Sequence, residues 1–358
     1  MKFEKLEKLS LYYNKITDIN ILEKENFKKL KELYLGNNNI SDISVLSIVN
    51  FEKLKKLGLN NNKIFDINIL EKTNFKELTG LNLGNNNISD ISVLSNVKFE
   101  KLEILILSNN KISDINILSK VNFKRLLELI LFKNIISDIR VLENVDFKKI
   151  KYLMLSYNKI SDINILEKAN FKELKVLSLD FNKCESIRIL SNVKFEKLEL
   201  LGLSGNNISD INVLEKVNFK ELKELELGAN NIDDIRILEK IKFEKLNKLL
   251  LHYNKISDIN ILEKTNFKEL KDLYLNNNNI SDISVLSNVN FEKIEKLGLS
   301  NNKISDINIL EKTNFKELKE LYLNNNKISY INLLEKVDFK VLKQLYLNNN
   351  IISNINLL

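Results

Sequence analysis

The sequence predicts an α/β repeat solenoid, with short parallel strands on one side and short helical turns on the other. Phenylalanine recurs every 24 residues from Phe3 to Phe339, without insertion or deletion. Leucines follow each of these phenylalanines after six and eight residues, and asparagine follows after eleven, in all fifteen copies. A unit this short cannot bury an apolar face alone, so successive units must stack and share one core.

The strand is indicated by alternation of leucine with other residues, as in "ELYLNNN" at 320–326. A period of two places the leucines on one side, toward the core, and the intervening residues on the opposite side. Successive units then form a parallel sheet with strands about 4.7–4.9 Å apart.

The segment after each strand carries polar columns with structural roles. We expect the asparagine column, for example Asn38, to turn inward and bond backbone groups of the loop, because buried backbone groups need partners. The Ser-Asp pair that follows, for example Ser41 and Asp42, is expected to cap the helical turn. The phenylalanines and later leucines fill the space between this turn and the sheet.

The repeat F-x-x-L-x-x-L-x-L-x-x-N-x-I-S-D-I-x-x-L resembles the leucine-rich-repeat family. Its signature is met in the first copy by Leu6, Leu9, Leu11, Asn14 and Ile16, and "NKISDI" segments are most similar to the internalin and phosphatase-1 regulatory-subunit types. The resemblance implies a curved horseshoe or arc, with the sheet on the concave face and 3-10 or α turns on the convex face. We expect one solenoid over 1–358, with the last of fifteen repeats truncated and no recognisable capping repeat.

Composition narrows the classes of function. The net charge of +7 comes from 55 basic and 48 acidic residues that are interleaved, which favours a solvated surface over nucleic-acid binding. One cysteine gives no disulfide framework, and no apolar run is long enough for a membrane span. The start "MKFEKLEKLS" is not a signal peptide, which slightly favours the cytoplasm. A cell-surface location fits if the chain is a fragment, so the compartment stays open.

No constellation for catalysis, metal or cofactor binding is predicted, so the chain is interpreted as a non-enzyme. His252 is the single histidine, and Cys184 replaces a core isoleucine as a small hydrophobe. The Asp column supplies one carboxylate per repeat, whereas calcium needs several converging oxygens.

The candidate contact site lies where the repeats differ. Residues five, seven, nine and ten after each phenylalanine project from the strand face, which is the usual binding surface in the family, and outer repeats carry mostly charged residues, Tyr, Gly or Asn there. In repeats five to nine these positions become largely apolar or aromatic, and the predicted partner-binding residues are Ile104, Ile106, Glu128, Ile130, Phe132, Tyr152, Met154, Tyr157, Val176, Phe181 and Leu200. Such a patch exceeds what monomers usually expose and resembles an interface centre. Alternatively, the side chains only pack on one another across adjacent strands.

A secondary candidate is an arginine column on the other side. Arg140, Arg188 and Arg236 share one position at 48-residue spacing. Arginine suggests planar contacts to carboxylates. Inheritance with a duplicated block explains the spacing equally well.

These observations predict a non-enzymatic module that binds a protein of unknown identity on its concave face. By resemblance it could be a surface adhesin segment or an intracellular adaptor. The alternative is a structural array that self-associates end to end through an apolar last repeat, with Ile351, Ile352, Ile355, Leu357 and Leu358 exposed.

Overall fold

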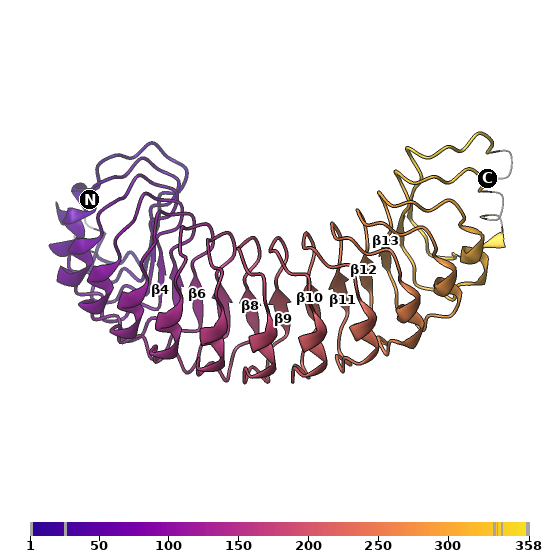
Figure 1. Ribbon diagram of the computed structural model, residues 1–358. Coiled ribbons are helices and arrows are strands. Elements are labelled where there is room, and N and C mark those ends of the chain that lie inside the picture. The colour runs from indigo at the N-terminus through magenta and orange to yellow at the C-terminus, as the bar shows by residue number, and fades with distance from the viewer. Residues whose placement is uncertain (1–2, 25–26, 332–333, 335, 338, 356–358) are drawn as a thin grey trace. The chain divides into compact units, whose positions relative to one another are not determined.

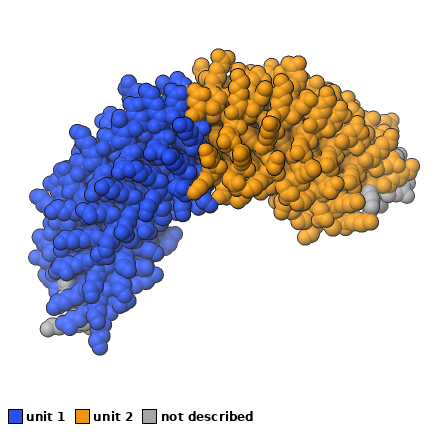
Figure 2. Space-filling view, turned by 90° about the horizontal axis from the view of Figure 1, so that it is seen from below, with its two compact units in different colours: residues 1–178, 193–195 blue, residues 179–192, 196–358 orange. Residues whose placement is uncertain are grey.

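The computed structural model describes residues 3–24, 27–331, 334, 336–337 and 339–355. The chain divides into two compact units (Figure 2), Met1–Ser178 with Val193–Phe195 and Leu179–Asn192 with Glu196–Leu358. Each unit is a run of the same strand-and-turn repeat, so the predicted α/β repeat solenoid is confirmed. Whether the whole chain is a single domain stays a prediction.

The first unit is built on a parallel sheet of three-residue strands paired in sequence order. Its strands are β1 Lys8–Ser10, β2 Glu32–Tyr34, β3 Lys56–Gly58, β4 Gly80–Asn82, β5 Ile104–Ile106, β6 Glu128–Ile130, β7 Tyr152–Met154 and β8 Val176–Ser178. One helical turn follows each of the first seven strands: α1 Ile21–Lys24, then the 3-10 turns η1 Ser44–Ser47, η2 Asn68–Lys72, η3 Ser92–Ser95, η4 Asn116–Ser119, η5 Arg140–Glu143 and η6 Asn164–Glu167.

The second unit repeats this pattern. Its strands are β9 Leu200–Gly202, β10 Glu224–Glu226, β11 Lys248–Leu250, β12 Asp272–Tyr274, β13 Lys296–Gly298, β14 Glu320–Tyr322 and β15 Gln344–Tyr346. Its turns are η7 Arg188–Ser191, η8 Asn212–Glu215, η9 Arg236–Glu239, η10 Asn260–Lys264, η11 Ser284–Ser287 and η12 Asn308–Lys312. Within each unit the turns lie on the side away from the strands (Figure 1). Among the described residues, no helix is long and apolar enough to cross a membrane.

The core lies between the sheet and the helical turns. The central leucine of each inner strand, such as Leu129, is buried, and the phenylalanine column forms a ladder of rings through each unit. The Phe51 and Phe75 ring centroids are 6.3 Å apart and nearly parallel, and Phe219 and Phe243 repeat this at 6.5 Å. The predicted shared core is therefore present in both units.

The asparagine column forms the predicted ladder to the backbone. The side-chain amide of Asn134 donates to the carbonyls of Leu107 and Leu131, each at 3.0 Å, and its oxygen accepts from the backbone N–H of Ile112 at 3.0 Å. One buried amide thereby satisfies groups in its own repeat and in the preceding one, as buried backbone groups require.

The aspartate column holds the start of most helical turns. Asp42 accepts a hydrogen bond from the backbone N–H of Ser44, the first residue of η1, at 2.7 Å. Asp282 does the same for Ser284 at 2.8 Å, and this bond lowers the pKa of the Asp282 carboxyl. The structure thus confirms the predicted cap for the aspartate.

The residue ten positions after each column phenylalanine is left-handed in every repeat, with φ between +51° and +58° wherever it is not glycine. Asparagine, which tolerates this conformation, occupies most outer repeats, for example Asn37 and Asn325. We call this the left-handed turn position. Tyr157 and Phe181 also occupy it, although bulky side chains are disfavoured there.

Candidate functional site

The strand face of the first unit carries two rows of predicted contact residues in direct register. Each inner strand buries its central leucine, and most leave the residues on either side half-buried, as in β6. One row consists of Ile104, Glu128, Tyr152 and Val176, which pair along strands β5 to β8. The other consists of Ile106, Ile130 and Met154. We call these seven residues, with Phe132 and Tyr157 beyond the strands, the apolar strand patch.

The first of these rows is mostly charged in outer repeats, whereas the second carries mostly Tyr or Gly there. The Glu32 carboxylate lies 3.1 Å from the Lys8 ammonium and 3.9 Å from that of Lys56, across β1 to β3. In the second unit Lys248 pairs with Glu224 at 3.2 Å. In the first row, the apolar strand patch therefore replaces a ladder of surface ion pairs by Ile104, Tyr152 and Val176, with Glu128 as the one charged residue.

Glu128 is the one carboxylate in the apolar strand patch. It is half-buried, and its register neighbours are Ile104 and Tyr152. No lysine, arginine or histidine nitrogen of the described chain lies within 4.0 Å of its carboxylate. A half-buried carboxylate is costly unless it gains a partner, so this position favours a cationic ligand group.

Tyr157 projects beyond β7 from the left-handed turn position. Its side chain is 46% exposed, and the Lys133 ammonium lies 5.6 Å from the centre of its ring. Its φ of +56° carries strain that an asparagine would not. Strained residues persist where the surroundings or a function require them.

We expect Tyr157→Asn to raise the free energy of unfolding by up to about 1 kcal/mol, because the left-handed backbone suits asparagine better than tyrosine. Urea denaturation followed by circular dichroism measures this change. Tyr253→Asn is the matched control, since Tyr253 has φ +53° at the same position in the second unit. A loss of stability in Tyr157→Asn alone would mean that this ring belongs to the fold rather than to a contact surface.

Phe181 and Leu200 lie in the second unit. Phe181 is 44% exposed, with φ +51°, and its ring lies over Gly205, where an added Cβ would come within 2.4 Å of the ring. Leu200 is half-buried at the start of β9, beside Glu224 in register. A role of either residue in partner binding stays a prediction.

The arginine column contacts carboxylates of this chain. Arg140 bonds Asp138 at 2.6 Å and Arg236 bonds Asp234 at 2.6 Å, while Arg188 lies 3.5 Å from Asp210 of the next repeat. The Arg140 guanidinium lowers the pKa of the Asp138 carboxyl. The predicted preference for carboxylates is met within the chain, and a role in partner binding stays a prediction.

The other residues considered for catalysis or metal binding, His252 and Cys184, pack against neighbouring parts of the fold. The His252 ring lies over Gly228, where an added Cβ would come within 2.4 Å of it, and burial lowers the pKa of this imidazole. Cys184 is fully buried in the isoleucine column. In the parts of the chain that the structure describes, no group of three His, Cys, Asp or Glu side chains converges as a metal site would require.

Two features of the surface were missed by the sequence reasoning. Phe65 is exposed on the turn side in a column that is otherwise mostly serine, and the same comparison between repeats would have found it. Glu226 is largely buried on β10, and its pKa is raised by desolvation and by the nearby negative charge of Asp180. The glutamate carries no such signal in sequence, because its burial depends on its neighbours.

Comparisons with known proteins agree with this architecture. The family described as Leucine Rich repeats (2 copies) matches residues 4–47. An internalin of Listeria monocytogenes is 28% identical, with a TM-score of 0.71 over 98% of this chain and 88% of its own. A leucine-rich-repeat protein of Leptospira interrogans is 25% identical, with a TM-score of 0.77 over 98% and 92% of the two chains.

The repeat ectodomain of a plant receptor kinase from Arabidopsis thaliana shares the fold at 21% identity, with a TM-score of 0.72 over 96% of this chain and 41% of that one. No curated protein sequence matches the chain.

Proposed function

Because this chain is a leucine-rich-repeat protein of internalin-like type, we propose that it binds a protein partner through the apolar strand patch. Leucine-rich-repeat proteins are generally non-enzymatic interaction modules, so no catalytic step is assigned. The partner surface is expected to be apolar at its centre, with a polar margin facing the charged and polar residues of outer repeats.

The observation that carries this proposal is that large apolar or aromatic side chains, apart from Glu128, fill two strand rows, one from β5 to β8 and the other from β5 to β7, where outer repeats carry mostly charged residues in one row and mostly Tyr or Gly in the other. Ile106, Ile130 and Met154 stand in consecutive register, only about 4.7–4.9 Å apart. Packing on one another covers their flanks, but their outer surfaces face away from the buried leucines and stay in water. Large apolar side chains gathered in this way are typical of the centre of an interface.

Glu128 and Tyr157 add specificity to the proposed surface. The carboxylate of Glu128 would gain most from a lysine or arginine of the partner, because it is half-buried without an ion-pair partner of its own. Tyr157 offers a large ring with few rotatable bonds at the edge of the patch, a common property of interface hot spots. In the second unit, Phe181 and Leu200 are proposed as further contacts on that unit's strand side.

Site-specific cross-linking tests the proposal. A photoreactive phenylalanine analogue at Phe132 is expected to link the partner in good yield, because this side chain stands beside the two apolar rows. The same analogue at Asn324 is the matched control, since Asn324 occupies the same repeat position in the second unit, nine residues after its column phenylalanine. Equal cross-linking from both positions would contradict an interface centred on the apolar strand patch.

Self-association is a second candidate function. Ile351 and Ile355 are 66% and 65% exposed, which leaves apolar surface beside β15, while Leu357 and Leu358 lie outside the described residues. Light scattering over a concentration range separates the two candidates. A constant monomer mass favours the partner-binding module, whereas a mass that grows with concentration favours an array.

A further inference from the structure

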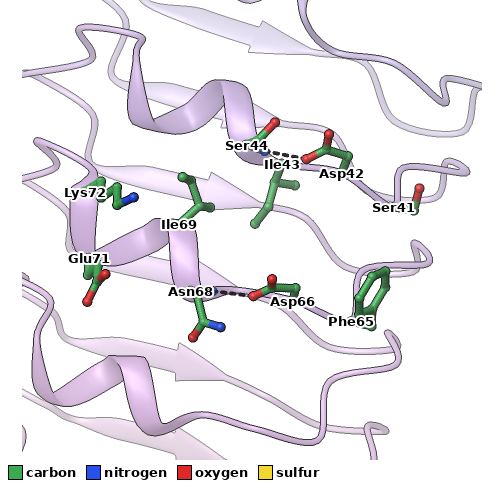
Figure 3. Close-up of a pocket in the computed structure, with 10 residues that line it drawn as sticks. All are labelled: Ser41, Asp42, Ile43, Ser44, Phe65, Asp66, Asn68, Ile69, Glu71 and Lys72. Carbon is green, nitrogen blue, oxygen red and sulfur yellow. Dashed lines mark hydrogen bonds between the residues drawn. The ribbon is translucent and has the colours of Figure 1, made fainter.

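Between η1 and η2 in the first unit lies a groove on the side away from the strands. Its volume is 480 Å³, and Asp42, Ser44, Phe65 and Asp66 line it (Figure 3). Lys72 lies at the opposite end of the groove from Phe65 (Figure 3), so its ammonium does not fill the end nearer Phe65 and the two aspartates. A similar groove of 410 Å³ lies between η3 and η4, with Asp90 and Asp114.

Phe65 distinguishes the first groove from the others. Its side chain is 65% exposed, whereas the matching position in the neighbouring repeats is Ser41 or Ser89. Exposing a phenyl ring to water costs the transfer free energy of its apolar area. Because most of the Phe65 side chain is exposed, burial in this fold offsets little of that cost. Its exposed face is available to a ligand.

The two carboxylates of the first groove are incompletely used by the fold. Asp42 and Asp66 each spend one oxygen on a backbone N–H, at 2.7 Å and 2.8 Å. Both residues are exposed, and within the described chain neither lies within 4.0 Å of a lysine or arginine nitrogen. Each therefore has acceptor capacity left for a ligand.

The corresponding groove in the second unit carries an arginine on its lining, with a side chain that is 81% exposed. Between η9 and η10 a groove of 420 Å³ is lined by Asp234, Arg236 and Asp258. The Arg236 guanidinium bonds both oxygens of Asp234, with Nε 3.0 Å from each and Nη2 at 2.6 Å from Oδ2. The hydrogen bond to Asp234 raises the pKa of Arg236, and the charge of Asp258 raises it further. Ser44 stands in the first groove where Arg236 stands here.

We propose that the groove between η1 and η2 binds an arginine side chain of a protein partner. The guanidinium pairs with Asp42 as Arg236 pairs with Asp234 in the second unit, it also bonds the free oxygen of Asp66, and its plane rests on the Phe65 ring. Arginine fits better than lysine, because a planar guanidinium both forks onto carboxylates and stacks on aromatic faces. This site is separate from the apolar strand patch and does not depend on it.

The test measures binding of two isotope-labelled blocked tripeptides, acetyl-Gly-Arg-Gly-amide and acetyl-Gly-Lys-Gly-amide, by the change in the NMR signals of the peptides. The arginine peptide is expected to bind saturably and at least severalfold more tightly than the lysine peptide. Phe65→Ser should weaken binding by about two- to fivefold, the loss of one exposed cation–π contact. Asp42→Asn with Asp66→Asn should weaken it at least tenfold, while the amide oxygens can still accept the backbone bonds.

Asp90→Asn with Asp114→Asn is the matched control in the groove between η3 and η4, and it should leave binding unchanged. The proposal is overturned if wild-type protein shows no saturable binding of the arginine peptide, if both peptides bind equally, or if the control variant loses as much affinity as the test variant. Phe65→Ser alters an exposed residue, so it remains informative even if the double aspartate variant unfolds.

Discussion

Phe171→Ala is expected to lower the free energy of unfolding by about 3–5 kcal/mol. Phe171 is only 2% exposed, and its ring stacks on Phe195 with the centroids 6.4 Å apart. Alanine would remove this contact and leave a cavity that the flanking repeats cannot close, because the strand spacing is set by their hydrogen bonds. The cost combines the lost apolar burial with the cavity.

The loss should be local, because each repeat contacts only its neighbours. Hydrogen exchange is expected to show reduced protection in the repeats of Phe171 and of its adjacent column phenylalanines, with little change near β1. Phe65→Ala is the matched control: it deletes the same side chain from an exposed site and should change stability by no more than about 0.5 kcal/mol. Unchanged protection around β8 in Phe171→Ala would contradict a shared phenylalanine column.

The repeat made much of this fold predictable from sequence. Residues in one column see the same surroundings in every repeat, so the conclusion that Asn38 turns inward extends to Asn134 and Asn278. The alternation of leucines similarly fixed which side of each strand is buried. Because the repeats are related by translation, the contacts inferred for one repeat apply to the others. The repeat thereby supplies information on long-range contacts that a single sequence normally lacks.

Features that break the symmetry were harder to predict. Arg140 and Arg236 were expected to seek carboxylates, yet the nearest carboxylate proved to be that of an aspartate two residues earlier in the chain. The left-handed turn position, which all repeats share, was missed as well, although its frequent asparagines are a recognisable signal. The burial of Glu226 depends on the side chains stacked around it, which a column-by-column reading does not give.

The electrostatic pattern of the strand face supports a localised contact rather than a uniform one. Exposed ion pairs such as Lys8 with Glu32 and Lys296 with Glu320 contribute about 0–1 kcal/mol each and are weakened by salt. They therefore do little for stability, but they keep outer strands hydrated and deter unspecific apolar contacts. Binding energy is available mainly where these ion pairs are absent. This is the case for strands β5 to β8, where Glu128 is the one charged strand residue.

Replacement of Ile130 by Tyr, Phe132 by Asn and Met154 by Tyr should reduce partner binding more than a hundredfold. These are the kinds of residue that outer repeats carry at the same positions, so the change restores the common surface of the repeat. Truncating central hot-spot residues costs about 2 kcal/mol or more each, and two such losses already exceed a hundredfold. The side chains are half-buried above the strand, so stability should change by no more than about 0.5 kcal/mol per site.

The control for this variant is Tyr274→Asn with Tyr322→Asn, which alters strand-face residues of the second unit and should leave binding nearly intact. Partner affinity is measured by calorimetry, and folding by circular dichroism and urea denaturation. If the triple variant unfolds, Ile130 and Met154 belong to the core and the strand phase is wrong. If it folds and binds normally, the contact surface lies elsewhere, and Arg140, Arg188 and Arg236 become the next residues to test. Only a folded triple variant that has lost its partner, beside a control that has kept it, supports the apolar strand patch as the contact centre.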